Sequence, residues 1–404
     1  IPNEDAARSL EAQLQGATYS VDSVEKRPRR QRPSPPFITS TLQQEAGRKL
    51  RFTAQRTMAV AQQLYEGLNV GADGSVGLIT YMRTDSTNVA EVAIQEARAY
   101  ISDRYGKQFV PDKPRVYRTR SKNAQEAHEA IRPTSIRRDP RSLAPYLSAE
   151  QLRLYTLVWE RMIASQMADA QLEATTVDVD ARCLGQSDEI FRFRATGSVL
   201  RFAGFRAVYL EGRDDVVDSE ENALPDLASG DGLINQNLAA NQHFTQPPPR
   251  FTEATLIKAM EDKGIGRPST YAPTIATLIE REYVEREQTR LTPTRMGFTV
   301  TDLLTEHFED VMDLNFTARM EADLDEVAQG NRDWVPVLRE FYDPFSKAIN
   351  KAAEKFAIAD QTDEVCEKCQ QPMAIKTGRF GRFLACTGYP KCRNTKDLGG
   401  RDRR

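Results

Sequence analysis

The chain has 404 residues, of which 40% are hydrophobic and 28% are charged, and this is the composition of a globular protein long enough for several domains. Its formal net charge of −3 excludes whole-molecule attraction to a nucleic acid, so any such binding has to come from local basic patches. No apolar run approaches the roughly 20 residues of a membrane-spanning helix, and the first residues lack the pattern of a signal peptide.

Residues 1–36 are expected to form the first part of a β-rich domain, truncated at its start, together with a linker. Tyr19, Val21 and Val24 alternate weakly, as in a strand with one exposed side. Residues 26–36 are rich in Pro and Arg, which predicts a solvated connector.

Residues 37–165 are predicted to be largely helical, because apolar residues recur there at helical spacing. One stretch differs: residues 78–82 predict a short strand. Since residues two apart on a strand point to the same side, Tyr81 and Arg83 would project together. A phenolic oxygen can attack a phosphodiester, and a neighbouring guanidinium can stabilise the negative charge that develops on the phosphoryl oxygens.

Residues 166–246 are expected to be the second part of the β-rich domain. Strand patterns occur at residues 175–180 and 191–195, and an acidic loop follows. Three successive prolines at 247–249 mark the end of this region.

Residues 247–360 are predicted to form a helical, winged-helix-like DNA-binding domain. A helix from Thr252, a glycine-bearing turn at 264–266, a helix from Pro268 and a hairpin at 283–291 follow in the order of winged-helix proteins.

The start of the second of these helices is a candidate phosphate site. Arg267, Ser269 and Thr270 lie where free N–H groups and the helix dipole favour an anion, although a Ser-Thr pair there can also be a simple cap. The glycines before them are not a nucleotide-binding loop, since no Gly-Lys-Ser/Thr follows, and no ATP site is expected.

Residues 361–404 are predicted to be a zinc ribbon with a basic tail. Cys366, Cys369, Cys386 and Cys392 have the spacing C-x2-C…C-x5-C, which suits one tetrahedral Zn²⁺ in a reducing compartment; two disulfides are the alternative. Arg379, Phe380, Arg382 and Phe383 interleave cations with aromatic rings between the cysteine pairs. Such a pattern favours single-stranded nucleic acid, where bases stack and phosphates pair.

Four segments together resemble bacterial DNA topoisomerase I, the type IA family. They are PFITSTLQQ at 36–44, GLITYMRTDSTN at 77–88, SKNAQEAHEAIRPT at 121–134 and GIGRPSTY at 264–271. With the cysteines, the resemblance covers roughly residues 15 to 395. It implies a multidomain α+β fold of toroidal architecture, with helical domains, a β-rich arch and a C-terminal zinc ribbon.

The resemblance also implies roles for individual residues. Tyr81 would be the nucleophile that becomes joined to a 5′ phosphate, with Arg83 as stabiliser and Asp85 orienting Arg83. His128, on a helix expected from 124 to 131, would contact Tyr81 or a phosphate. Arg132, Arg267, Ser269 and Thr270 would bind the DNA backbone.

One part of the type IA pattern is not found. The family holds Mg²⁺ with a glutamate and a D-x-D-x-E motif in an N-terminal metal-binding (TOPRIM) domain, and neither Asp178 with Asp180 nor Asp323 with Asp325 completes such a motif. Because Ile1 also takes the place of a starting methionine, we expect a fragment that lacks this domain and is inactive alone.

The resulting expectation is an ATP-independent enzyme that relaxes negatively supercoiled DNA by single-strand cleavage, strand passage and religation. Its partner would be DNA, without membrane or nucleotide, and it would act as a monomer in the cytoplasm, associated with the nucleoid. The alternative is a non-catalytic clamp for single-stranded DNA with a zinc ribbon. Trapping a covalent DNA adduct would discriminate between the two.

Overall fold

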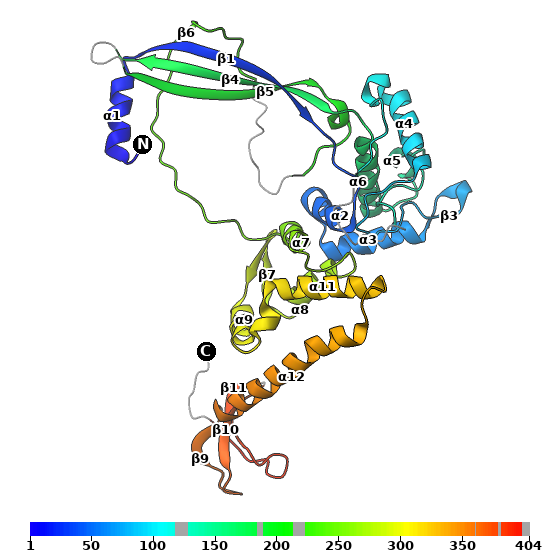
Figure 1. The fold of residues 1–404 in the computed structure, drawn as a ribbon, viewed down its shortest axis with the longest axis vertical. Helices are drawn as coiled ribbons and strands as arrows, with labels where there is room; N and C mark the ends of the chain where they lie inside the picture. Colours follow the sequence, from blue (N-terminus) through cyan, green and yellow to red (C-terminus); the bar gives the residue numbers. More distant parts are fainter. Residues whose placement is uncertain (118–127, 184–188, 213–222, 360, 379–380, 398–404) are drawn as a thin grey trace. The chain divides into compact units, whose positions relative to one another are not determined.

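The computed structural model describes residues 1–397 except 118–127, 184–188, 213–222, 360 and 379–380 (Figure 1). The chain divides into two compact units, Ile1–Thr294 and Arg295–Arg404. This boundary falls inside the domain predicted for residues 247–360. Helices and sheets are both present, so the mixed α+β class is confirmed. Within the described residues, no helix is both long and apolar enough to cross a membrane.

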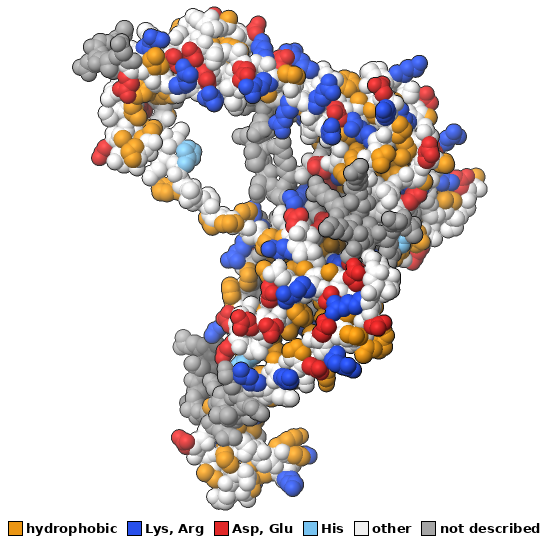
Figure 2. Space-filling model, in the orientation of Figure 1, with side chains coloured by type: hydrophobic (Ala, Val, Ile, Leu, Met, Phe, Trp, Pro, Cys, Tyr) orange, Lys and Arg blue, Asp and Glu red, His pale blue; other side chains and the backbone are white. Residues whose placement is uncertain are grey.

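The largest sheet of the first unit is antiparallel, with strand order β5-β4-β1-β6 (Figure 1). Its strands are β1 (Thr18–Gln31), β4 (Ala170–Arg182), β5 (Ile190–Phe202) and β6 (Gly232–Leu233). Val21, Ala170, Val177 and Ala181 are its buried apolar residues. Basic and acidic side chains are interspersed over the sheet (Figure 2), and two of the acids, Asp178 and Asp180, are paired with arginines of β5.

Two predictions for residues 1–36 were wrong. Residues Glu4–Leu14 form helix α1, which Asn3 caps by accepting a hydrogen bond from the Ala6 N–H. The predicted connector after residue 26 is strand up to Gln31, paired along its length with β4. Backbone hydrogen bonds to β4 hold this polar segment extended, so its side chains need no apolar alternation.

Residues 37–165 carry the main core, and their predicted helical character is confirmed outside residues 118–127. Leu42, Leu64, Ile101, Tyr155 and Met162 are fully buried in this core. The helices are α2 (Thr39–Glu45), α3 (Ala54–Glu66), α4 (Glu91–Tyr105), α5 (Pro140–Leu143) and α6 (Ala149–Ser165), with the π-helical turn η1 (Ala46–Leu50), the short helices η2 (Gly71–Asp73) and η3 (Lys107–Phe109), and the small hairpin β2 (Leu68–Asn69) and β3 (Ser75–Val76).

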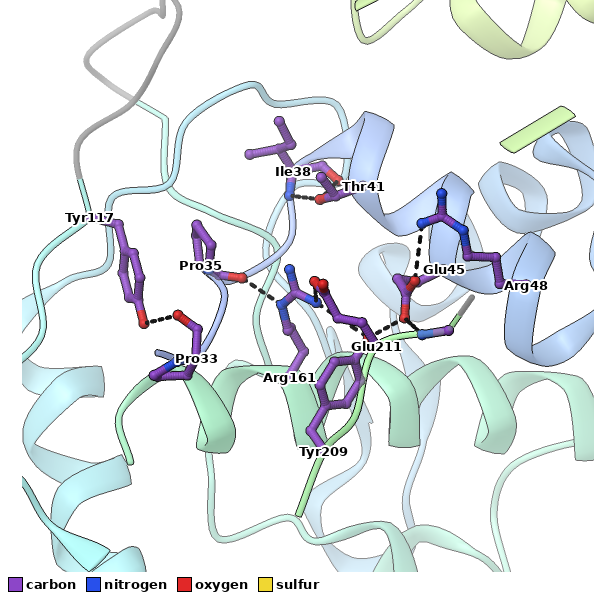
Figure 3. Close-up of polar contacts among 11 residues, drawn as sticks. Pro33, Pro35, Ile38, Thr41, Glu45, Arg48, Tyr117, Arg161, Tyr209 and Glu211 are labelled. Carbon is purple, nitrogen blue, oxygen red and sulfur yellow. Dashed lines mark hydrogen bonds and ion pairs between the residues drawn. The ribbon is translucent and has the colours of Figure 1, made fainter. Parts of the chain in front are cut away.

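Arg161 of α6 joins this helical region to the segments that connect it to the sheet (Figure 3). Its side chain is only 4% exposed and lies against the rings of Phe37 and Tyr209, at 4.7 and 5.2 Å from their centroids. It donates to the Pro35 carbonyl at 2.6 Å and to Glu211 at 2.8 Å. Burial opposes ionisation of Glu211, but the Arg161 charge holds the pKa of that carboxyl below its usual value.

Buried Glu45 completes this joint from the end of α2 (Figure 3). Its Oε2 accepts from the Tyr209 hydroxyl at 2.5 Å and from the Gly212 N–H at 3.0 Å, while Oε1 pairs with Arg48 at 3.2 Å. The chain therefore enters and leaves the helical region through one hydrogen-bonded cluster. The short helix η4 (Gly204–Ala207) leads into it.

The elements predicted for the start of the winged-helix-like region are confirmed. They are α7 (Glu253–Asp262), α8 (Tyr271–Glu280), and the antiparallel hairpin β7 (Val284–Glu287) and β8 (Arg290–Pro293). Helix α8 begins at Tyr271 rather than at Pro268, because residues 268–270 form a turn. Gly266 before this turn has a φ of +84°, and a Cβ there would meet Thr270 Oγ1 at 3.2 Å.

The second unit contains four helices and the ribbon among its described residues. The helices are α9 (Arg295–His307), α10 (Glu309–Met312), α11 (Leu314–Ala328) and α12 (Trp334–Ala359). The ribbon sheet has the order β12-β11-β10-β9, made of β9 (Gln361–Val365), β10 (Pro372–Gly378), β11 (Gly381–Cys386) and β12 (Thr395–Asp397).

Candidate active site and metal centre

The segment that carries Tyr81 is anchored on both sides of the tyrosine. The predicted strand over 78–82 was wrong: only Ile79 makes a β-bridge, to Pro133. The Thr80 N–H instead donates to the Arg132 carbonyl at 2.9 Å, and the Thr39 hydroxyl donates to the Met82 carbonyl at 2.7 Å. These hydrogen bonds, made by the residues before and after Tyr81, hold its backbone in place although it has no strand partner.

Tyr81 lies at the surface with its ring between two others. The side chain is 39% exposed, and its ring meets Tyr65 at 5.4 Å and His128 at 5.8 Å between centroids, both edge to face. These contacts orient the ring while part of it stays accessible. His128 therefore lies next to Tyr81, as expected. A catalytic role for either residue stays a prediction.

Arg83 projects to the solvent beside Tyr81, since Met82 and Thr84 on either side of it are buried. It lines a groove of about 330 Å³ whose opposite wall includes Ser269 and other residues of α8 and the turn before it. Among the residues described, no hydrogen bond or ion pair joins Arg83 to Asp85, so the orienting role expected for Asp85 gains no support. An exposed guanidinium without a carboxylate partner can accept a phosphate.

The prediction of a helix from 124 to 131 was wrong for residues 128–131, the part that the structure describes. Residues 118–127 lie outside the described part, but 128–131 are not helical, and Ile131 bridges to Phe37. Pairing with that backbone replaces the helical turn. Arg132 follows with a side chain 13% exposed, paired with Glu129 and donating to the Pro133 carbonyl at 2.9 Å. Unlike that of Arg83, this guanidinium is already bound to a carboxylate and a backbone carbonyl.

Arg267, Ser269 and Thr270 lie together before α8. The Arg267 guanidinium donates to the Gly266 carbonyl at 2.9 Å, and the Thr270 hydroxyl accepts from the Arg267 N–H at 2.8 Å. Thr270 is the N-cap residue but its side chain does not cap α8. Ser269 and Thr270 are exposed, but the N–H groups of Thr270 and Tyr271 donate to the Arg267 carbonyl, so the exposed side chains are the accessible polar groups here.

The four ribbon cysteines converge on one point. Their sulfur atoms lie within 4.8 Å of one another, with Sγ–Sγ distances of 3.7 Å for Cys366–Cys392 and 3.2 Å for Cys369–Cys386. Four thiolates around Zn²⁺ at ~2.3 Å would be about 3.8 Å apart, so the set fits a tetrahedral zinc ion. None of these cysteines is in a disulfide.

Polar donors favour the ionised form of Cys366, whereas for Cys386 and Cys392 a backbone N–H that lowers the pKa is outweighed by burial and by hydrogen bonds with the neighbouring thiols, which raise it. Burial opposes ionisation of Cys366, but N–H groups of Lys368 and Cys369 and the Asn394 amide lower its pKa to about 6. Asn394 Nδ2 lies 3.4 Å from Cys366 Sγ, and the Gly388 N–H donates to Cys386 Sγ at 3.3 Å. Donors of this kind support bound thiolates.

The proposed nucleic-acid face of the ribbon is described only in part. Arg379, Phe380 and the side chain of Arg382 lie outside the described residues. Phe383 is half-buried on β11 opposite Lys376. Sequence reasoning gave less weight to Tyr389, which is exposed and has the Arg393 guanidinium 6.0 Å from its ring centroid.

Mg²⁺, which the resemblance implies, has no fitting site among the described residues. The metal-capable group of three or more side chains found there is the cysteine set, and Mg²⁺ requires oxygen ligands. Asp178 and Asp180 bind Arg194 and Arg192 at 2.7 and 2.9 Å, and Asp323 pairs with Arg332.

Two site features were missed by sequence reasoning. Tyr65, near the end of α3, contacts Tyr81 only because the tertiary fold brings it there, and no spacing signals this. Glu253 of α7 contacts both the start of α3 and Arg286. Its place as the first residue of a helix could have suggested only a favourable dipole interaction.

Comparison with known proteins agrees with these features. A family model for DNA topoisomerase matches residues 1–339, and one for the topoisomerase DNA-binding C4 zinc finger matches residues 363–399. The chain is similar to full-length topoisomerase I from Thermotoga maritima, with 36% identity and a TM-score of 0.74. That similarity covers 97% of this chain and 62% of the Thermotoga chain, so this chain spans less than two thirds of that protein. Because most of its length matches the family model, the chain belongs to the bacterial topoisomerase I family of type IA DNA topoisomerases.

Proposed function

We propose that this protein is the strand-cleaving part of an ATP-independent enzyme that relaxes negatively supercoiled DNA. One observation carries the proposal: Tyr81 is accessible, its ring contacts Tyr65 and His128, and nearby Arg83 is exposed with no ion pair among the described residues. This arrangement offers a nucleophile and a charge stabiliser on an anchored backbone.

The proposed reaction is a reversible transesterification. Tyr81 Oη loses its proton and forms a bond to the phosphorus, while the bond to the 3′ oxygen breaks and that oxygen takes up a proton. The product is a 5′-phosphotyrosine and a free 3′ hydroxyl. Religation reverses each change, and since one ester replaces another, no ATP is needed.

Other residues have supporting roles in this proposal. Arg83 stabilises the charge on the phosphoryl oxygens, and His128 orients the Tyr81 ring or contacts the phosphate. Arg267, Ser269 and Thr270 hold the DNA backbone at the start of α8. Arg132 supports the segment through Glu129, and direct phosphate binding would require a phosphate to replace that carboxylate.

The ribbon is proposed to bind single-stranded DNA through its basic and aromatic residues. Zn²⁺ at the four cysteines supplies a structural tie for this small sheet. Since no acidic Mg²⁺ motif occurs in the sequence, we expect these 404 residues alone to bind DNA without relaxing it.

A plasmid assay tests the proposal. Negatively supercoiled DNA with Mg²⁺ is incubated with the chain alone, and with the chain joined to a type IA metal-binding domain. We expect relaxation only in the joined protein, and none after Tyr81→Phe. Relaxation that survives Tyr81→Phe would overturn the assignment of the nucleophile. DNA binding without cleavage in the joined protein would favour the non-catalytic clamp instead.

A further inference from the structure

The inference concerns the contact between helices α2 and α3 and helices α7 and α8 within the first unit, which we call the seam. The groove beside Arg83 is one of three hollows along it. The other two have volumes of about 430 and 180 Å³, and each is lined by residues from both sides, including Thr53 and Glu253. Side chains that border an open hollow lack neighbours on that side, so this contact is packed less completely than a continuous core.

The apolar contact that α3 makes across the seam is also small. From α3, Ala54 is the buried residue and Met58 is partly buried, and they face a cluster on α7 and α8. The members of that cluster are Ile257, Met260, Tyr271, Ala272 and Ile275. An alanine removes little surface from water, so burial alone gives this contact modest stability.

Polar contacts therefore matter more at the seam than in the main core. Glu253 has a side chain 13% exposed, and its Oε2 accepts from the Ala54 N–H, the first amide of α3, at 2.8 Å. Its other oxygen pairs with Arg286 of the hairpin. Gln44 also reaches across, donating to Glu261 at 3.5 Å, at the limit of a hydrogen bond. Of these two contacts across the seam, the one made by the Glu253 carboxylate is the shorter, and its acceptor is charged.

We propose that Glu253 is the latch of this seam, whose walls separate in the strand passage of the proposed function. This rests on the proposed function: Arg83 and Ser269 line opposite walls of one groove, so the two ends of a cut strand would be held on opposite sides. A second strand can pass between those ends only if the walls separate. Glu253 acts here as a positioning residue, which sets how readily the seam opens and takes no part in bond cleavage.

Hydrogen exchange of the whole chain without DNA tests this. Exchange of protected amides follows the population of open forms, so weaker closure gives faster exchange on both walls. In Glu253→Ala we expect at least about tenfold faster exchange for the amides of residues 54–58 and 271–276. A tenfold change corresponds to about 1.4 kcal/mol. In Glu253→Gln the amide oxygen can still accept from Ala54, and a smaller increase is expected.

Glu150→Gln is the matched control. Glu150 also pairs with an arginine that lies on α3, Arg56, but that pair stays on one side of the seam. Glu150→Gln should leave the exchange rates of the amides of residues 54–58 and 271–276 unchanged. The amides of residues 154–165 in α6 should stay protected in every variant, which reports that the main core remains folded. Helix α7 keeps its own cap, since Thr252 accepts from the Thr255 N–H.

The outcomes separate the alternatives. Faster exchange confined to the first amides of α3 would mean that Glu253 is only a helix cap, and the latch would be rejected. Equal exchange in Glu253→Ala and the unmodified chain would reject it as well. Because no DNA is cut in this experiment, its failure is distinct from a failure of the Tyr81 assignment.

Discussion

At the scale of single residues, the site contains two guanidinium groups in contrasting environments. Arg83 is exposed and unpaired among the described residues, while Arg132 is mostly buried, bound to Glu129 and to a backbone carbonyl. An arginine already bound to a carboxylate contributes to stability, whereas a free one beside a nucleophile is available to a substrate phosphate.

The two arginines should therefore respond differently to truncation. Arg83→Ala is expected to leave stability within about 0.5 kcal/mol and to lower the rate of DNA cleavage in the joined protein by about 10²- to 10³-fold. Arg132→Ala should cost about 1–3 kcal/mol of stability, because Glu129 and the Pro133 carbonyl lose their donor. Urea unfolding and a cleavage time course measure both. Equal effects on stability would contradict this distinction.

Sequence reasoning reached part of this site. Tyr81 and Arg83 are both exposed and Met82 and Thr84 are buried, as the alternation in the sequence predicts, although the segment is not a strand. The position of Tyr65 beside Tyr81 and the pairing of Ile131 with Phe37 in place of a helix both depend on contacts with distant segments. Local pattern carries no information on such contacts.

At the scale of elements, the joint around Arg161 shows how the helical region is fixed to the segments that lead to the sheet (Figure 3). Arg161 and Glu45 bind backbone or side-chain groups of two connecting segments, one before α2 and one after η4. Burial lowers the pKa of nearby Lys49, whose ammonium lies 3.7 Å from the Tyr209 ring centroid. The joint is a buried polar network, and the seam at Glu253 is a small and open contact.

Removing Arg161 should thus destabilise the first unit. In Arg161→Met the apolar stem is kept, but the Pro35 carbonyl and Glu211 lose their donor, at a cost of about 1–3 kcal/mol. Chemical denaturation measures the loss, with Arg201→Met as control, since Arg201 pairs with Glu173 on the exposed surface of the sheet. A loss no larger than that of the control would refute a structural role for the joint.

The ribbon makes a second prediction at this scale. We expect one zinc ion per chain by elemental analysis, and chelation should increase proteolysis only after residue ~360, because the cysteines are the main tie of a small sheet. Cys386→Ser should have the same effect as chelation. Chelation that also unfolds helices of the first unit, or a chain that folds fully without zinc, would show that the metal has another role.

Some elements could be predicted from the sequence and others could not. Helices α7 and α8 with their hairpin have clear apolar spacing and turn residues, and the cysteine spacing indicates the metal site. The second half of β1 has no apolar alternation, since its backbone pairing with β4 is what holds it. Helix α1 was missed because the weak alternation at Tyr19, Val21 and Val24 was extended back over the whole start of the chain, whereas the strand begins only at Thr18.

At the scale of the whole molecule, DNA binding has to overcome a net charge of −3. From Cys366 to Arg404 there are ten Lys or Arg residues against three Asp or Glu, so the excess of positive charge is local. Tyr389 and Arg393 form an exposed pair of ring and guanidinium in this region. Such a pair suits an unpaired base and its phosphate.

Binding of single-stranded oligonucleotides should therefore depend on the ribbon and on salt. Tyr389→Ala should weaken binding by about 1–3 kcal/mol, and Arg393→Ala should reduce the slope of log affinity against log salt by about 0.7. Fluorescence anisotropy at several salt concentrations measures both. Tyr342→Ala removes an equally exposed tyrosine from α12 and serves as the control. A similar loss in the control would remove the specific role of Tyr389.

The most direct test of the account is to identify the residue that becomes joined to DNA. The chain joined to a type IA metal-binding domain is incubated with a single-stranded oligonucleotide and Mg²⁺, denatured during cleavage, digested and analysed by mass spectrometry. The account predicts a DNA-linked peptide that contains Tyr81, retained in Tyr65→Phe and absent in Tyr81→Phe. An adduct on Tyr65, or any adduct that persists in Tyr81→Phe, would contradict it.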